Sequence, residues 1–251
     1  LSFETAAVKL GMGLVSTENA REFSSAAKGE TLEDTIQVLN QYGYDIIVIR
    51  HHEKGAARRA ARVSHTPIIN AGDGKGEHPT QALLDAYTVK RHHGRLDNLN
   101  ITMGGDLRYG RTVRSLAHVL ARHKGNCITF VSIPELQVSE DIKKWLKATK
   151  TKFSQTDSIT EAFKNADVVY WTRLQTENLK GPSKLPKGGF TIVKKHLKLL
   201  PKSSLIMHPL PRVGEIDPAV DADPRAHYFR QAGNGLYVRM ALLENILEGG
   251  K

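Results

Sequence analysis

Short apolar runs rich in β-branched residues alternate along this chain with amphipathic segments, and this alternation constrains the fold most. The runs have the length and composition of buried strands. They cover residues 13–17, 45–50, 67–70, 99–103, 127–132, 167–172 and 204–207. The segments with helical spacing of apolar residues include 31–42, 55–63, 79–93 and 235–247. Strands that alternate with helices form parallel sheets covered by helices. We therefore predict an α/β fold of two doubly wound domains with parallel sheets, joined by helices.

The polar connection at residues 94–98 marks the predicted boundary between the domains. A chain of 251 residues is long enough for two ordinary domains. We expect a first domain over residues 1–94, a second over residues 95–230, and a C-terminal helix over residues 231–251 that returns to the first domain. Residues 1–10 have the pattern of a helix already under way, without a preceding cap.

Composition argues against several classes of protein. Forty percent of the residues are hydrophobic and 25% are charged, which is close to the average for globular chains. No apolar run approaches the roughly 18 residues that span a bilayer, so no membrane partner is expected. The single cysteine, Cys127, cannot form an internal disulfide and is expected to be a small buried residue. We predict a cytoplasmic protein.

The net charge of +10 raises the possibility of a nucleic-acid partner. The excess lies in one stretch, because Lys143 to Lys202 holds 13 lysines and one arginine against four acidic residues. These lysines are spread among predicted helices and their connections, which is typical of a solvated surface. A solvated face that attracts small anionic substrates is therefore the favoured interpretation, and no nucleic-acid partner is expected.

A glycine-rich loop follows the predicted strand at residues 67–70 and precedes a helix that begins near Pro79. His78 and Gln81 flank the start of that helix. Ligands bind at such strand ends in α/β folds. The loop matches neither the Walker motif nor the dinucleotide fingerprint. Two interpretations stay open: a ligand loop with His78 as a contact, or a plain turn with a satisfied histidine at a helix start.

Three arginines follow predicted strands or open the next helix. Arg50 and Arg173 stand at strand ends, and Arg111 follows the segment Gly104 to Gly110. A guanidinium near exposed backbone donors suits an anion. One such arginine is ordinarily a solvated side chain, but three in the same setting favour an anion-binding edge.

A proline turn, His208-Pro209-Leu210-Pro211-Arg212, follows the last predicted strand. Each proline removes a backbone donor, so neither a strand nor a helix continues through it. The turn is either a rigid connection or a device that holds a backbone carbonyl toward a ligand, and either proline could be cis.

Together these motifs resemble those of the aspartate carbamoyltransferase family. The shared elements occur in the family's order: Arg50-His51, Asn70 to Gly74, His78 to Gln81, Gly105 to Leu107, Tyr109 to Thr112, Thr172 to Gln175 and His208 to Arg212. The resemblance covers essentially the whole chain. The related ornithine enzymes generally carry a cysteine in the proline turn and a Ser-Met-Gly element, which this chain lacks. Arg173 and Gln175 suit a dicarboxylate, so aspartate is the expected acceptor.

The resemblance implies that carbamoyl phosphate and L-aspartate are the substrates and that pyrimidine biosynthesis is the pathway, with no metal or organic cofactor. Residues 1–94 would bind carbamoyl phosphate and residues 95–230 aspartate. Arg50 and His78 would contact the carbamoyl carbonyl, and Gln81 with the Leu210–Pro211 backbone would receive the carbamoyl NH2.

Arg111, Arg173 and Gln175 would hold the aspartate carboxylates. Ser24 and the catalytic Lys28 correspond to a loop that enters the neighbouring subunit's site, so a homotrimer with shared active sites is expected. Regulatory chains are further partners that the resemblance allows.

The chain also departs from the family pattern. The Ser-Thr-Arg-Thr-Arg phosphate loop stands directly before the Leu-Ser-Phe-Glu motif in the family, and this chain begins at that motif. We therefore expect residues 1–251 alone to be nearly inactive. A non-catalytic carboxylate-binding or regulatory relative is the alternative. His52, Gly104 and Asn178 replace a usual proline, valine and arginine.

Overall fold

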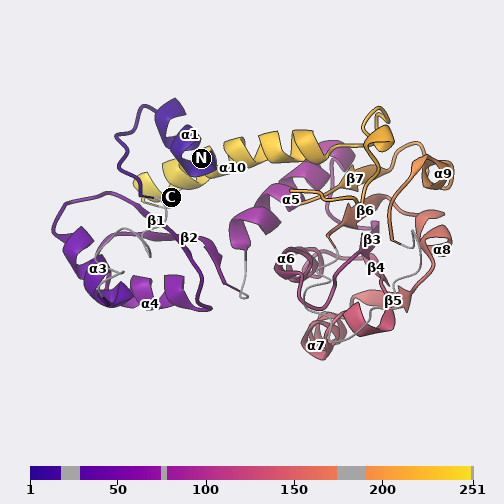
Figure 1. The fold of residues 1–251 in the computed structure, drawn as a ribbon, viewed down its shortest axis with the longest axis horizontal. Helices are drawn as coiled ribbons and strands as arrows, with labels where there is room; N and C mark the ends of the chain where they lie inside the picture. Colours follow the sequence, from indigo (N-terminus) through magenta and orange to yellow (C-terminus); the bar gives the residue numbers. More distant parts are fainter. Residues whose placement is uncertain (18–28, 75–77, 174–189, 250–251) are drawn as a thin grey trace. The chain divides into compact units, whose positions relative to one another are not determined.

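In a computed structural model, the chain folds into two compact units (Figure 1). The smaller unit comprises Leu1–Thr80 and Gly235–Lys251, and the larger comprises Gln81–Asn234. The structure describes residues 1–17, 29–74, 78–173 and 190–249. This division differs from the boundary at residues 94 and 95, which stays a prediction about the domains.

The smaller unit is built around two parallel strands. Its elements are α1 (Ser2–Lys9), α3 (Leu32–Asn40), β1 (Ile47–His51), α4 (Ala56–Val63), β2 (Ile68–Asp73), the first turn of α5 (Pro79–His93) and most of α10 (Tyr228–Leu247). Ile47 of β1 lies beside Ile68 of β2. Apolar residues of α3 and α4 pack with these strands, whereas α1 and α10 form a second apolar cluster with Ile69.

The ends of the smaller unit's elements follow local sequence signals, with one exception. Thr31 caps α3, because its hydroxyl accepts the Asp34 amide N–H at 3.1 Å and donates to the Asp34 carboxylate at 2.7 Å. The predicted strand at residues 13–17 is wrong: these residues have no regular structure and are exposed. Their apolar side chains are not buried against another described strand, and Val15 is 76% exposed.

The larger unit contains a five-stranded parallel sheet with the order β5-β4-β3-β6-β7. Its strands are β3 (Asn100–Gly104), β4 (Cys127–Val131), β5 (Lys152–Thr156), β6 (Val168–Trp171) and β7 (Leu205–Met207). The elements between them are α6 (Arg111–Leu120), η2 (Pro134–Leu136), α7 (Glu140–Ala148), α8 (Ile159–Phe163) and α9 (Lys194–Leu197), and η4 (Pro218–Val220) precedes α10. All the described sheet pairings are parallel, which confirms the predicted class of two parallel-sheet α/β domains.

The strand period of two residues sends alternate side chains to two separate cores. Met103, Phe130 and Tyr170 belong to the core that includes residues of α6 and α7. Val169 and Trp171 belong to the core that includes residues of α8 and α9. Figure 1 shows these two helix pairs on opposite sides of the sheet. Because the strands are buried on both faces, they appear in the sequence as continuous apolar runs.

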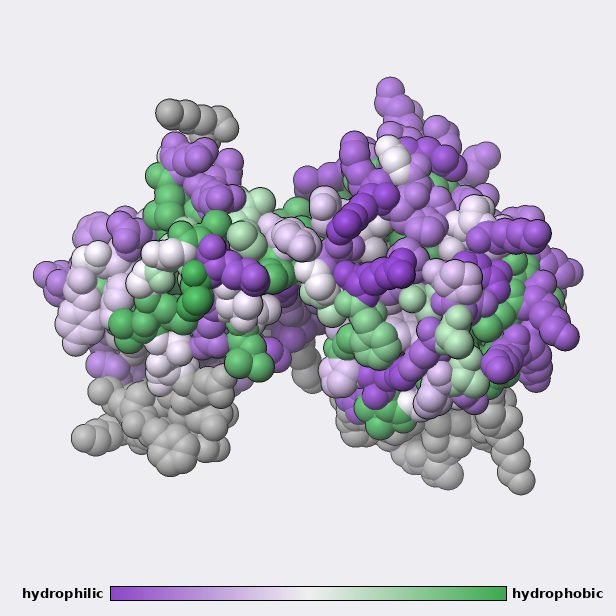
Figure 2. Space-filling model, turned by 90° about the horizontal axis from the view of Figure 1, so that it is seen from above, coloured by the Kyte–Doolittle hydropathy of each residue, from purple (hydrophilic) through white to green (hydrophobic). Residues whose placement is uncertain are grey.

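Hydrophilic residues cover much of the larger unit's face in Figure 2, where that unit lies on the right. This distribution agrees with lysines that are spread over a solvated surface. Among the described residues, no helix is both long and apolar enough to cross a membrane.

Candidate active site

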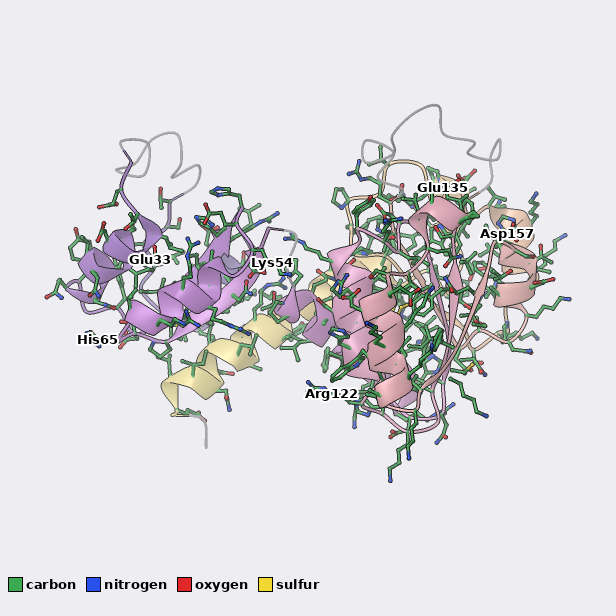
Figure 3. All side chains as sticks on the ribbon, turned by 90° about the horizontal axis from the view of Figure 1, so that it is seen from below. Glu33, Lys54, His65, Arg122, Glu135 and Asp157 are labelled. Carbon is green, nitrogen blue, oxygen red and sulfur yellow. The ribbon has the colours of Figure 1, made fainter. Side chains whose placement is uncertain are left out.

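In the larger sheet, the direction in which successive strands are added reverses between the neighbouring strands β3 and β6. From β3 the chain adds β4 and β5 on one side, and β6 and β7 follow on the other. At such a switch point the loops leave in opposite directions and open a crevice at the carboxyl ends of the strands. Figure 3 shows Glu135 and Asp157, which follow β4 and β5, toward one end of the unit, and Arg122, which precedes β4, toward the other.

Two glycines let β3 and β6 approach closely at the switch point. A Cβ on Gly105 would lie 2.6 Å from the Thr172 hydroxyl and closer still to the Thr172 carbonyl oxygen. Gly105 also has a φ of 104°, which an L side chain rarely adopts. A Cβ on Gly104 would meet the indole ring of Trp171, at 2.5 Å from its Cη2 atom. Gly104, one of the departures from the family pattern, thus makes room for this large buried ring.

The loop after β3 is held in place by the buried Asp106. Its Oδ1 atom accepts the Arg108 and Tyr109 amide N–H groups at 3.1 and 2.9 Å. Gly110 then serves as the N-cap of α6, and Arg111 is the first residue of that helix. The loop therefore places the half-buried Arg111 at the start of a helix, where backbone N–H groups favour an anion.

Thr172 and Arg173 continue the neighbouring strand β6 at the same edge. The Thr172 amide and hydroxyl both donate to the Gly104 carbonyl, at 2.9 and 3.1 Å. Thr172 is buried, whereas the side chain of Arg173 is exposed. The fold thus brings the loops that carry Arg111 and Arg173 to adjacent strand ends. Gln175 lies outside the described residues.

The proline turn follows β7 and is organised by a buried histidine. His208 Nδ1 accepts the Leu210 N–H at 2.8 Å, so the Nε2–H of the neutral ring faces Glu215 at 2.7 Å. Burial acts to raise the pKa of Glu215, but hydrogen bonds from His208 and the Val213 amide outweigh it, so the pKa falls below its ordinary value. The Leu210–Pro211 peptide bond is cis, and Leu210 has a φ of 50°.

Arg212, the last residue of the turn, is anchored within the larger unit. Its Nη2 atom donates to Asp221 at 2.6 Å, and its guanidinium lies 5.3 Å from the centre of the Tyr228 ring. The Asp221 hydrogen bond raises the pKa of Arg212. Arg212 therefore ties the end of the proline turn to Asp221 and Tyr228.

Gln81 lies in the first turns of α5, where its side-chain amide is held by a carboxylate. Its Nε2 atom donates to Asp85 Oδ1 at 2.9 Å. Asp85 is completely buried, and the same oxygen accepts Gln231 Nε2 of α10 at 2.6 Å. Sequence analysis missed Asp85, although a charged residue four positions after Gln81, within an otherwise apolar part of the helix, was a usable signal.

In the smaller unit, the loops that follow β1 and β2 are joined. Gly55 N–H donates to Asp73 Oδ2 at 2.7 Å, and Gly74 N–H donates to the His51 carbonyl at 2.8 Å. Arg50 lies in β1 beside this junction with an exposed side chain. These bonds fix the shape of the parallel strand ends beside the exposed side chain of Arg50.

His78 directly precedes α5 and is half-buried. Its Nδ1 atom lies 3.4 Å from the hydroxyl of Thr80, a residue that is itself only 3% exposed. The ring is thus oriented by the first turn of the helix.

The predicted site residues divide into three groups. Arg50 and His78 belong to the smaller unit, and Gln81, Arg111, Arg173, Leu210 and Pro211 belong to the larger. Ser24, Lys28 and Gln175 lie outside the described residues, as does Asn178. Within the larger unit, the strand order brings the loops of Arg111, Arg173 and Leu210 to one edge. The catalytic and binding roles of all these residues stay predictions.

Two family models cover nearly the whole chain. The carbamoyl-P binding domain of aspartate/ornithine carbamoyltransferases matches residues 1–91, and the Asp/Orn binding domain of the same family matches residues 97–246. Aspartate carbamoyltransferase, chloroplastic, of Oryza sativa subsp. japonica is 52% identical over 99% of this chain and 69% of the rice protein. The Arabidopsis thaliana enzyme is also 52% identical, and the match covers 64% of its length. This chain therefore spans about two thirds of these plant relatives.

Solved structures agree with the sequence matches. The catalytic subunit of Methanocaldococcus jannaschii aspartate transcarbamoylase superimposes with a TM-score of 0.92 at 45% identity, covering 99% of this chain and 80% of the other. The Trypanosoma cruzi aspartate transcarbamoylase in complex with N-(phosphonacetyl)-L-aspartic acid gives a TM-score of 0.89 at 40% identity, covering 96% and 77%. Other structures of that trypanosome enzyme hold carbamoyl phosphate or aspartate.

The predicted cytoplasmic location is overturned by the plant relatives. The enzymes from rice, Arabidopsis and pea, at 50 to 52% identity, are all named chloroplastic. The prediction failed because it rested on composition, and a folded enzyme domain has the same balance of apolar and charged residues in either compartment.

These matches confirm the resemblance inferred from the motifs and the predicted enzyme class, a carbamoyl-group transferase. They extend over both halves of the chain, they include relatives at 52% identity, and the names of the relatives specify aspartate as the acceptor. This chain belongs to the aspartate carbamoyltransferase family.

Proposed function

We propose that this protein transfers the carbamoyl group of carbamoyl phosphate to the amino group of L-aspartate. The amine nitrogen forms a bond to the carbamoyl carbon, the bond from that carbon to the phosphate oxygen breaks, and a proton leaves the nitrogen. The products are N-carbamoyl-L-aspartate and phosphate, and the step belongs to pyrimidine biosynthesis. The non-catalytic alternative has no specific support in the described residues.

One observation supports the proposal most directly. The loops that carry Arg111, Arg173 and Leu210 follow β3, β6 and β7, so they leave the same edge of one parallel sheet, beside its switch point. Ligands of open α/β sheets bind at this edge. Two guanidinium groups offer paired donors for two carboxylates, and Arg111 adds a helix start. A dicarboxylic amino acid fits this arrangement better than a cationic one.

The carbamoyl group needs different partners from the aspartate. His78 is proposed to donate a hydrogen bond to the carbamoyl oxygen, where negative charge develops as the amine attacks. Arg50 would assist there and contact the phosphate. Gln81 and the Leu210 backbone carbonyl, with Pro211 beside it, would accept the carbamoyl NH2. These residues act by positioning and by electrostatic stabilisation.

Replacing Arg173 with alanine should weaken the use of aspartate while leaving carbamoyl phosphate binding nearly unchanged. The lost bond between guanidinium and carboxylate is worth about 2 to 5 kcal/mol in kcat/KM once the substrate desolvates the pair. The measurement is steady-state kinetics with each substrate varied in turn. Arg122→Ala removes the same charge at the opposite end of the sheet. It should change kcat/KM for neither aspartate nor carbamoyl phosphate. An Arg173→Ala enzyme with parental aspartate kinetics would contradict the assignment.

We also propose a homotrimer in which Ser24 and Lys28 of one subunit reach the site of the next. A mixture of Lys28→Ala and His78→Ala subunits should then regain activity after exchange, because some hybrid sites contain both native residues. Activity of exchanged hybrids, purified by two different tags, checks this. Hybrids that form and stay as inactive as either parent would rule out shared sites.

A chloroplast location is the proposal that the plant relatives support. The rice and Arabidopsis enzymes at 52% identity carry that description.

A further inference from the structure

A buried carboxylate joins two predicted substrate contacts within the larger unit. Asp85 of α5 has no exposed surface, and its Oδ1 atom accepts two N–H groups. One comes from Gln81 Nε2 at 2.9 Å, and the other from Gln231 Nε2 at 2.6 Å. Gln231 is 1% exposed and belongs to α10, so the contact links residues far apart in the sequence.

The chain of bonds continues from Gln231 into the proline turn. Gln231 Oε1 accepts the His208 backbone N–H at 2.9 Å. His208 then accepts the Leu210 N–H on its ring nitrogen at 2.8 Å. Asp85 is therefore connected to Gln81 directly and to the Leu210 backbone through two intermediate residues.

The Oδ1 atom of Asp85 sets the direction of each of these bonds. It is the acceptor in both, so both glutamines turn their NH2 groups toward it. The Oε1 atom of Gln231 is then left to receive the His208 N–H. The Oε1 atom of Gln81 is left without a hydrogen bond to any residue in the described parts of the chain, and it can accept one from a ligand.

The carbamoyl NH2 has two N–H groups and needs two acceptors. Gln81 with its amide reversed would present a second NH2 group, which repels the first and cannot accept its hydrogen bond. A side chain as mobile as glutamine therefore needs a partner that fixes its orientation, and a buried acceptor within one helical turn provides it.

We propose that Asp85 is a positioning residue for carbamoyl transfer, which orients the Gln81 amide and, through Gln231 and His208, the Leu210 carbonyl toward the carbamoyl NH2. This role rests on the proposed function of Gln81 and Leu210. It goes beyond joining the two helices, because α5 and α10 have a separate buried link: Asn234 Nδ2 donates to the Thr88 hydroxyl at 3.0 Å.

The buried hydroxyl of Tyr170 interacts electrostatically with Asp85 and is neutral. Burial raises the pKa of Tyr170 well above its ordinary value, and the Asp85 carboxylate raises it further. Tyr170 therefore stays protonated in the working pH range, so the carboxylate faces no second negative charge from β6.

Asp85→Leu removes the acceptor and keeps the site apolar and similar in volume. We expect kcat to fall about 10-fold to 100-fold, because a small displacement of the reacting groups has a cost of this size. The KM for aspartate should stay within about threefold. Asp85→Asn keeps an oxygen acceptor and should retain at least about a third of kcat. The matched control, Thr88→Val, removes a buried hydrogen bond between the same helices and should leave kcat within about twofold. Parental kcat in Asp85→Leu, or an equal loss in Thr88→Val, would overturn the proposal.

Gln231→Glu tests the same role if Asp85→Leu does not fold. When protonated, this glutamic acid has the shape of glutamine, donates to Asp85 and accepts from His208. When ionised, it opposes the Asp85 carboxylate. Asp85 and His208 are hydrogen-bonded to Gln231 directly, and the Tyr170 hydroxyl interacts with Asp85. The ratio of variant to parent kcat should fall at least about tenfold from pH 6 to pH 9. A ratio that does not change with pH would reject the inference.

Different results would reject the proposed function and the positioning role of Asp85. A parent protein that forms no carbamoyl aspartate removes the proposed function itself. A parent that is active, with Asp85 and Gln231 variants whose folded fraction is equally active, removes only the positioning role.

Discussion

Replacing Gly105 with alanine is expected to lower the free energy of unfolding by about 2 to 5 kcal/mol. The added Cβ would meet the backbone and hydroxyl of Thr172, and the residue would keep a φ of 104° that alanine disfavours. Because a backbone cannot rotate away, the ends of β3 and β6 must separate. Denaturant unfolding followed by circular dichroism measures the loss.

Gly104 provides the matched comparison, because its added Cβ would meet a side chain instead. Gly104→Ala should cost about 1 to 3 kcal/mol through overpacking against Trp171. Adding Trp171→Leu removes the ring and should make the Gly104→Ala change less costly, whereas it should not rescue Gly105→Ala. Equal rescue of both variants would contradict the close approach of the two strand ends.

Replacing His78 with alanine should reduce kcat by roughly 10²-fold to 10³-fold, the typical cost of one donor aimed at a developing oxyanion. Arg111 and Arg173 are unaltered, so the affinity for an aspartate analogue such as succinate should change little. Single-turnover and steady-state kinetics, combined with analogue titration, separate the two effects.

The control for this experiment is His65→Ala, an exposed histidine of the smaller unit that is labelled in Figure 3. It should keep the parental kcat. A His78→Ala enzyme with more than about a third of the parental kcat would mean that this histidine does not stabilise the reacting carbonyl.

The sequence predicted those elements whose signals are local. The bounds of α5, Pro79–His93, coincide with the predicted helix because proline opens it and Gly94 follows with a φ of 70°. The buried strands β3, β4, β6 and β7 were predicted from their apolar runs. Both kinds of signal lie within a few residues of the element that they specify.

Elements that depend on distant contacts were predicted less well. The edge strand β5, Lys152–Thr156, has a largely polar sequence and is defined by its pairing with β4. The helix α10 begins at Tyr228, three positions before the predicted C-terminal helix at residues 231–251 and seven before the periodic segment at residues 235–247. Glycines near the predicted start obscured the helical pattern, whereas the contacts of Gln231 and Asn234 with α5 support the helix there.

The candidate site shows the same division. Arg111, Arg173 and the proline turn could be predicted to share one edge of the larger sheet because parallel strands place their carboxyl ends together, a rule that needs only the strand assignments. Asp85 was not found, because its role depends on a glutamine from a helix 146 positions later in the chain. A single sequence does not indicate which polar residues on separate helices will meet.

The choice of acceptor is decided by incubating the full-length protein with labelled carbamoyl phosphate and either L-aspartate or L-ornithine. Products would be separated by chromatography, and phosphate release would be measured in parallel. We expect N-carbamoyl-L-aspartate and phosphate in equal amounts, inhibition by N-(phosphonacetyl)-L-aspartate, and no comparable turnover of ornithine. Citrulline formation in preference to carbamoyl aspartate, or binding of both substrates without turnover, would contradict it.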